Sequence, residues 1–212
     1  MPSSFASANT RDMEAWGHPR QTPSKSVARA GRFGAGTGAP GVTLSIRHPV
    51  SIVCVIARKG RTDAVSSLLH AQYGIALPTA GRSATAEELV LHWCGANQYY
   101  AQAEDLAEAR LYRELRSHLE GVASCSDQSH GRVIFSLVGP RVRDLLAKGT
   151  SVDLHPRIFG PGHCAVTQMA HVGVHLAQTG PDAFEISVAR SFSCGFWEWL
   201  AGQAQELGYE IR

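Results

Sequence analysis

The order of strand-like and helix-like segments constrains the fold of this chain more than any other feature of its sequence. From residue 41 onward, short β-rich runs alternate with segments whose apolar side chains recur at helical spacing. The strand-like runs are 41–48, 50–60, 88–103 in two pieces around Gly95-Ala96-Asn97, 133–138, 165–178 and 183–190, and the helix-like segments are 62–74, 105–121 and 191–208. Two strands followed by a helix is the commonest unit, which predicts an α+β fold with two related strand-strand-helix halves, 41–120 and 121–212.

The segment 131–149 (GRVIFSLVGPRVRDLLAKG) could be mistaken for a phosphate-binding loop. Such a loop needs two glycines around four variable residues, followed by Lys and Ser or Thr, so that several backbone amides face the phosphate. Here one glycine at the break precedes Pro140, which has no amide hydrogen. We therefore expect a buried strand at 133–138 and then a short helix, with Pro140 at its first position and Gly149 as a left-handed C-terminal cap.

Composition narrows the class of protein. At 212 residues and 44% hydrophobic, the chain can bury one full core or two small ones. Twenty basic against eighteen acidic residues give a net charge of +2, so we expect no nucleic-acid partner. Five scattered cysteines without a Cys-x-x-Cys pair, and no apolar signal segment, indicate a reduced cytoplasmic protein. No window approaches the roughly 18 apolar residues of a membrane helix, so we expect no membrane span.

Residues 1–40 differ in composition from the rest of the chain. They are rich in Ser, Pro, Gly, Ala and Arg and show no hydrophobic periodicity, so they cannot bury enough surface to offset their chain entropy. Five basic against two acidic residues would also suit an organelle transit peptide, but scattered Arg in a solvated tail is commoner. We expect a disordered or partner-ordered arm over 1–40 and a single α+β domain over 41–212.

Four residues are the best candidates for metal ligands: His163, Cys164, His171 and His175. His163 and Cys164 are adjacent, so on a strand they point to opposite faces. On an extended chain, His171 and His175 lie roughly 13 Å apart. Histidines that are hydrogen-bonded or exposed are therefore the preferred interpretation.

Nucleophilic catalysis by a cysteine would need a thiolate next to a base. Any of the five cysteines could pair in space with one of ten histidines, and the sequence singles out no pair, so buried thiols are expected instead. Asp127 and Asp153 could be catalytic acids, but each lies near a strand end or loop without a second carboxylate. We expect them to form local bonds from the side chain to the backbone.

The last helix-like segment concentrates aromatic area in Phe192, Phe196, Trp197 and Trp199. Phe196 and Trp197 share one helical face with Leu200 and are expected in the core, whereas Trp199 points elsewhere. Core alone and core plus subunit interface both remain open for this helix.

Three segments together closely resemble the gamma subunit of heterotetrameric sarcosine oxidases. They are DQSHGRVIFSLVGPRVRDLLAKG (127–149), VDLHPRIFGPGHCAVTQMAHVGVHL (152–176) and FEISVARSFSCGFWEWL (184–200), and the resemblance covers most of residues 41–210. It implies a folate-binding domain like the N-terminal part of aminomethyltransferases. It also implies an enzyme of alpha, beta, gamma and delta chains that oxidatively demethylates sarcosine to glycine, releases hydrogen peroxide and passes the one-carbon unit to tetrahydrofolate. The implied FAD, FMN, NAD and zinc lie on the other chains.

The same resemblance implies that this chain lacks the folate chemistry. The aminomethyltransferase pattern carries an Asp-Asp pair where this sequence has Ala177-Gln178, so the acid has no counterpart. We expect no catalytic, cofactor-binding or metal residue on this chain, and direct contact with the alpha chain through Asp153, His155, Arg157 and Trp199. The alternatives are the equivalent subunit of a related flavoenzyme such as N-methylglutamate dehydrogenase, or a one-carbon carrier that binds tetrahydrofolate directly.

Overall fold

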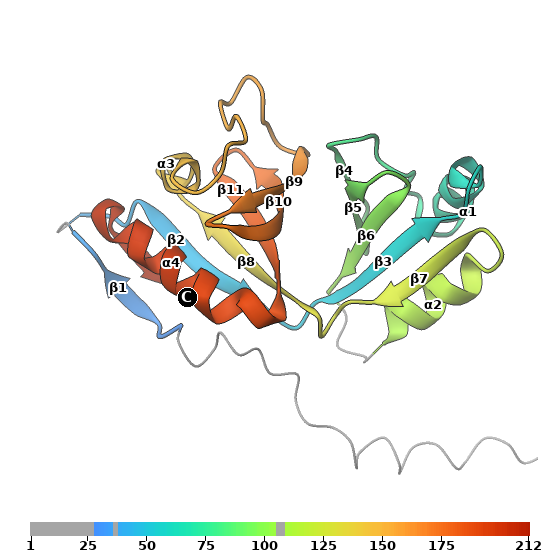
Figure 1. The fold of residues 1–212 in the computed structure, drawn as a ribbon, viewed down its shortest axis with the longest axis horizontal. Helices are drawn as coiled ribbons and strands as arrows, with labels where there is room; N and C mark the ends of the chain where they lie inside the picture. The colour runs from blue at the N-terminus through green and yellow to red at the C-terminus, as the bar shows by residue number, and fades with distance from the viewer. Residues whose placement is uncertain (1–27, 36–37, 105–108) are drawn as a thin grey trace, which may run out of the picture.

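The computed structural model describes residues 28–35, 38–104 and 109–212, and this part of the chain forms two β-sheets side by side, with helices on their outer faces (Figure 1). The predicted α+β class is confirmed. No helix among the described residues is long and apolar enough to cross a membrane.

The larger sheet has seven strands in the order β1-β12-β2-β8-β11-β10-β9. They are β1 (Gly31–Phe33), β2 (Val42–Arg47), β8 (Arg132–Val138), β9 (Cys164–Met169), β10 (Val172–Gly180), β11 (Ala183–Ala189) and β12 (Tyr209–Ile211). Neighbours are antiparallel except β12 and β2, which are parallel. Its helices are α3 (Val142–Ala147) and α4 (Ser193–Ala204), with 3₁₀ turns η2 (Arg190–Phe192) and η3 (Gln205–Leu207) at the two ends of α4.

The smaller sheet has five antiparallel strands in the order β4-β5-β6-β3-β7. They are β3 (Ser51–Ala57), β4 (Ser83–Thr85), β5 (Val90–Gly95), β6 (Gln98–Ala103) and β7 (Ala123–Asp127), and helices α1 (Thr62–Tyr73) and α2 (Arg110–His118) cover them. Each sheet has its own hydrophobic core between strands and helices. Full burial of one large apolar side chain contributes about 1.5–3 kcal/mol, so each helix is held mainly by its buried face.

The two predicted halves exist, but each gives its first strand to the other half's sheet. Apart from β12 and β1, the sheets have matching orders, β9-β10-β11-β8-β2 and β4-β5-β6-β3-β7. In the first, β2 comes from the first half of the chain, and in the second, β7 comes from the second half. The chain crosses between the sheets at 48–50 and again at 128–131. This exchange ties the two halves together.

The end of α1 matches the expected helical segment 62–74, whereas both ends of α3 depart from the prediction. Gly74 caps α1 in the left-handed conformation, with φ 66°. Gly149 does not cap α3, whose last turn ends at Lys148 in right-handed geometry. A Cβ on Gly149 would overlap the Trp199 ring, so close packing, not backbone handedness, requires this glycine. Pro140 lies before the helix, inside the turn that the Val142 amide closes on Gly139 O.

The N-terminal segment is described only in part. Residues 31–33, within the expected arm, form β1 and pair with Tyr209 to Ile211 of β12. The arm expected over 1–40 therefore contains at least one strand of the sheet. Residues 1–27 lie outside the described residues, as do 105–108 at the start of the expected helix 105–121.

Candidate functional site

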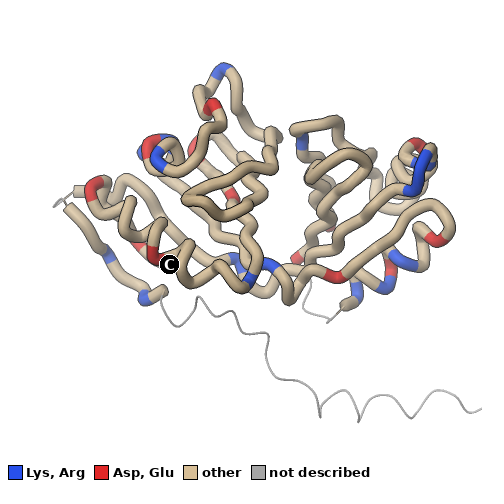
Figure 2. The backbone as a smooth tube through the Cα atoms, in the orientation of Figure 1, with Lys and Arg blue, Asp and Glu red and all other residues tan. Residues whose placement is uncertain are grey.

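The two sheets meet along their helix-free faces, and the seam between them holds a cluster of buried aromatic and titratable side chains. His92 on β5 and Tyr100 on β6 face His175 on β10 of the larger sheet, with ring centroids 5.2 Å apart for His92–His175 and 5.6 Å for Tyr100–His175. His92 is 2% exposed and His175 is 3% exposed. Figure 2 shows the charged residues mainly on the helices and outer loops, with few on the strands beside the seam.

Both seam histidines are neutral at physiological pH. Burial lowers the pKa of His92 to about 4, and burial together with the neighbouring His92 lowers the pKa of His175 to about 3. His175 Nε2 lies 3.1 Å from Trp93 O and donates to it, and His92 Nδ1 lies 2.7 Å from Ser83 Oγ. The His175 bond crosses from the larger sheet to the smaller one and suits a structural join, whereas the His92 bond fixes that ring within the smaller sheet.

Arg132, the first residue of β8, brings a guanidinium group to the same seam. Its Cζ atom lies 5.0 Å from the centroid of the Tyr100 ring, and Nε and Nη2 donate to the Ser187 hydroxyl and carbonyl oxygens at 2.8 Å each. A cation over an aromatic face in a desolvated site contributes about 1–2 kcal/mol. Arg132 thus holds β8 and β11 against β6.

Three of the five free cysteines, Cys54, Cys94 and Cys164, lie in or near the seam, whereas Cys125 packs against the helix-covered core of the smaller sheet. Their thiols differ in acidity. A hydrogen bond with Cys94, opposed by burial and assisted by Arg132, lowers the pKa of Cys54 to about 7. The pKa of Cys94 is correspondingly raised, and burial raises the pKa of Cys125 to about 11. The Cys164 thiol donates to main-chain carbonyls, at 3.1 Å for Arg82 O. Cysteine catalysis requires a thiolate paired with a histidine base. This arrangement does not provide such a pair.

The four candidate metal ligands do not converge. His175 lies in the seam, whereas His163 Nδ1 accepts hydrogen bonds from the Gly160 amide and from Arg82 Nη1 at 3.0 and 3.1 Å. His171 lies in the β9–β10 turn, where its φ is 64°. Among the residues that the structure describes, no group of three His, Cys, Asp or Glu side chains could hold a metal ion.

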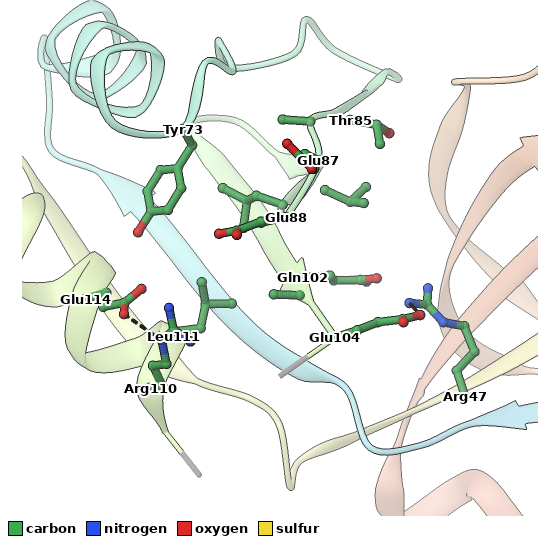
Figure 3. A pocket seen from close by; sticks show the side chains of 14 residues that line it. Arg47, Tyr73, Thr85, Glu87, Glu88, Gln102, Glu104, Arg110, Leu111 and Glu114 are labelled. Carbon is green, nitrogen blue, oxygen red and sulfur yellow. Dashed lines mark hydrogen bonds and ion pairs between the residues drawn. The ribbon is translucent and has the colours of Figure 1, made fainter. Parts of the chain in front are cut away.

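A cavity of about 430 Å³ opens beside the seam, at the ends of β5 and β6. Figure 3 shows the Tyr73 side chain pointing toward Glu114 and Arg110 on α2, and Arg47 entering from the larger sheet toward Glu104. The two arginines are paired, because Arg47 lies 3.0 Å from Glu104 and Arg110 lies 2.8 Å from Glu114. Burial, then Glu114, raises the pKa of Tyr73.

Sequence reasoning missed this cavity, and no sequence signal marks it. Its carboxylates, Glu87, Glu88, Glu104 and Glu114, outnumber Arg47 and Arg110, so it favours cations over anions. The lining side chains come from the end of β2, the end of α1, the segment from the end of β4 to the start of β5, the end of β6 with Glu104 after it, and α2. Such distant segments carry no common motif.

Three of the expected interface residues lie together on the loop between α3 and β9. Asp153 Oδ1 accepts a hydrogen bond from the His155 amide at 2.9 Å, and His155 Nδ1 accepts one from the Arg157 amide at 3.2 Å. All three are exposed, and the next residue, Ile158, is 58% exposed. Arg143 anchors the loop by donating to the carbonyls of Leu154 and Phe159. The loop is therefore pinned at its base and presents both charged and apolar side chains to solvent.

The fourth expected interface residue, Trp199, lies near the start of this loop, against Gly149. It is half-buried, and its ring is 5.5 Å from that of Phe196. Phe196, Trp197 and Leu200 are buried, as predicted, at 2%, 2% and 0% exposure. The prediction that Trp199 points away from this core face is confirmed only in part, because Trp199 is half-buried and packs against the core of the larger sheet.

The prediction for the two candidate acids is confirmed, because both aspartates bond locally. Asp127 Oδ1 accepts hydrogen bonds from the Ser129 amide at 2.9 Å and the Ser129 hydroxyl at 2.6 Å. Asp153 makes the equivalent bond to the His155 amide. Each carboxylate therefore shapes a turn.

Comparison with known proteins identifies the family. Residues 59–206 match the model of the "Sarcosine oxidase, gamma subunit family". The chain belongs to this family. Curated relatives include the sarcosine oxidase subunit gamma of Corynebacterium sp. (strain P-1), 28% identical over 200 residues, covering 90% of this chain and 93% of the relative. The subunit gamma of an Arthrobacter species is 29% identical over 191 residues, covering 89% of this chain and 91% of the relative.

Solved structures agree with the family assignment. A chain of the heterotetrameric sarcosine oxidase from Corynebacterium sp. U-96 matches with a TM-score of 0.76 and 28% identity, covering 87% of this chain and 94% of that one. The glycine cleavage system aminomethyltransferase T from Bartonella henselae matches with a TM-score of 0.64 and 18% identity, covering 88% of this chain and 56% of that one. The second likeness shows a shared fold, as expected for the folate-binding class.

The family's fold raises the question of whether the chain could handle a folate amine. Ala177 and Gln178, which stand where the resemblance places carboxylates, are both 2% exposed in β10. The Gln178 amide nitrogen donates to the carbonyls of Gly180 and Pro181 at 2.8 and 3.1 Å. A buried amide committed to backbone carbonyls cannot supply the acid-base role of an aspartate, so these residues do not fit a reactive folate site.

Proposed function

We propose that this chain is the gamma subunit of a heterotetrameric sarcosine oxidase and that it contributes to assembly and not to catalysis. The observation that carries the proposal is the match to a chain of such a heterotetramer over 94% of that chain's length at 28% identity. The complex would oxidatively demethylate sarcosine to glycine in the cytoplasm and pass the one-carbon unit to tetrahydrofolate.

The chemistry of the described residues favours a role in assembly over a role in catalysis. The buried histidines are neutral and fixed by hydrogen bonds, the aspartates close turns, and Gln178 stands where an acid would act. FAD, FMN, NAD, tetrahydrofolate and zinc would accordingly be held by the alpha, beta and delta chains. This subunit would pack directly against the alpha chain and support its folate-binding region.

The loop that carries Asp153, His155 and Arg157 is our proposed contact with the alpha chain, with Trp199 near its start. Support comes from its exposure together with its anchoring by Arg143, because a pinned loop loses little conformational entropy on binding. The exposed Ile158 side chain adds an apolar centre to this charged surface.

Co-expression of the four chains tests the assembly. We expect this chain to copurify with a flavin-containing complex that consumes oxygen when sarcosine is added, and the isolated chain to be inactive. A folded isolated chain that never joins a flavin complex, or that turns over sarcosine alone, would refute the proposal. Comparison of N-methylglutamate with sarcosine as substrate tests the related-flavoenzyme alternative.

The loop contact is tested separately by charge reversal. Arg157→Glu should weaken copurification with the alpha chain, whereas Arg113→Glu, the same charge reversal at an exposed position on α2, should not. Equal behaviour of the two variants would contradict the loop assignment.

Direct folate binding is the remaining alternative, and thermal stability separates it. A ligand that binds the folded chain raises its melting temperature as ligand concentration increases. We expect no shift with tetrahydrofolate for the isolated chain, and a concentration-dependent shift would establish the alternative.

A further inference from the structure

The free edges of the two sheets differ in how they are covered. The outer edges of β4 and β9 meet at the seam, where Arg82 bridges to His163 and the Ser83 amide donates to Gly162 O at 2.8 Å. On the other side of the larger sheet, the terminal strand β1 has only three residues. Strand β7 of the smaller sheet has five residues and pairs with β3 alone among the described strands.

The matching strand orders show what is missing at β7. In the larger sheet the corresponding strand is β2, and β12 pairs with its outer edge in parallel, Tyr209 opposite Val42 and Ile211 opposite Leu44. The smaller sheet has no equivalent of β12 among the described residues. One half of the chain therefore completes its edge with its own C-terminal strand, whereas no strand among the described residues covers the edge of the other half.

The register identifies the backbone groups that point outward from β7. Gln128 N donates to Ile52 O and Arg58 N donates to Val122 O, which places the hydrogen-bonded pairs with β3 at even-numbered positions of β7. The amide and carbonyl of Cys125 therefore point away from β3, as does the amide of Asp127. These backbone groups could form hydrogen bonds with another strand added at this edge.

The edge also lacks the features that block strand addition. Exposed edges are usually protected by Lys, Pro, a bulge or inward-pointing charge. The sequence of β7 is Ala-Ser-Cys-Ser-Asp, and its pairing with β3 is continuous without a bulge. Its one charged side chain, Asp127, is turned onto Ser129. Small side chains at Ser124 and Ser126 would let a second strand approach closely.

We propose that an extended segment of a partner subunit pairs with β7 and extends the smaller sheet, as β12 does on β2. This inference rests on the proposed function, since membership of a heteromeric complex supplies the partner. A segment of the partner that pairs with β7 uses main-chain hydrogen bonds for affinity and needs little side-chain specificity.

A proline at position 125 tests the ladder. Cys125→Pro removes only an outward amide and adds bulk at the edge, leaving the β3 ladder intact. Cys125→Val retains the amide and the half-buried side chain and is the matched control. In the co-expressed complex we expect Cys125→Pro to weaken copurification at least about tenfold and Cys125→Val to leave it unchanged. Proline at 125 with normal assembly would overturn the inference while leaving the gamma-subunit function standing.

Hydrogen exchange on the wild-type protein gives a test that does not depend on folding of the variant. The Cys125 and Asp127 amides should exchange at least tenfold more slowly in the complex than in the isolated chain. Unchanged exchange would refute strand addition. A homodimer of the isolated chain that Cys125→Pro abolishes would assign the edge to a second copy and would equally overturn the proposal.

Discussion

Acidification should open the seam between the sheets, because the His92–His175 pair must be neutral to stay buried. The ordinary pKa of histidine is about 6.5, whereas burial holds these two at about 4 and about 3. As the pH falls below 6.5, these two histidines bind protons in the unfolded chain but remain neutral in the folded chain. Stability therefore falls as the pH drops from 6.5 and levels off only near pH 3.

The size of this loss is large relative to the stability of a typical domain. At pH 5 each histidine costs about 2 kcal/mol, because one pKa unit corresponds to about 1.4 kcal/mol and the pH lies about 1.5 units below the unfolded value. The pair together costs about 4 kcal/mol, out of the 5–15 kcal/mol that stabilises most domains. The nearby Arg132 guanidinium is one of the causes that hold the pKa of His175 this low, since protonation would place two positive charges side by side.

Urea denaturation between pH 7.5 and 4.5 measures the loss. The matched comparison is the double variant His92→Gln and His175→Gln, whose amides can still hydrogen-bond but do not titrate. We expect the wild-type free energy of unfolding to fall by about 4 kcal/mol more than that of the variant between pH 7 and pH 5. Parallel curves for the two proteins would refute the reasoning. Nuclear magnetic resonance titration that places either pKa near 6.5 in the folded chain would do the same.

Three further outcomes are expected. Gly149→Ala should lower stability by about 1–3 kcal/mol in urea denaturation, because the new methyl would overlap the indole packed against it; no change would show that the α3–α4 contact is loose. Arg47→Leu should cost about 1–3 kcal/mol because it leaves the largely buried Glu185 carboxylate unpaired, whereas Arg141→Leu, which removes an exposed pair with Asp144, should cost under about 0.5 kcal/mol. Equal losses in urea denaturation would contradict the role of burial. At pH 7.5 iodoacetamide should modify Cys54 before Cys125, since the lower pKa gives more thiolate, and the reverse order by mass spectrometry would contradict the assigned acidities.

The fold class was predictable because strand and helix periodicities are local. All side chains of the run 133–138 are apolar except that of Ser136, as expected for a strand covered on both faces. The run forms β8 in the middle of the larger sheet. Leu111 and Leu115 lie on one helical face and are buried in α2. The α3 cap was mispredicted because the reason for Gly149 is a ring from α4, fifty residues away in sequence.

The candidate site was predictable only in fragments. The local bonds of Asp127 and Asp153 follow from residue type and position, and the structure contains them. The pairing of His92 with His175 joins strands of different sheets, and neither residue lies in a motif. The cavity beside them draws on five separate segments and could not be found by scanning the sequence.

The sequence alone determined the order of strands and helices, the faces they bury and the family to which the chain belongs, since each depends on residues close together in the chain. Only the tertiary structure decided that β2 and β7 change sheets, that β12 covers one edge, and that β7 has no such neighbour among the described residues. Strand pairing is chosen by backbone hydrogen bonds and by packing between distant segments. Backbone groups are the same in every residue, so the choice of partner leaves little trace in any local pattern.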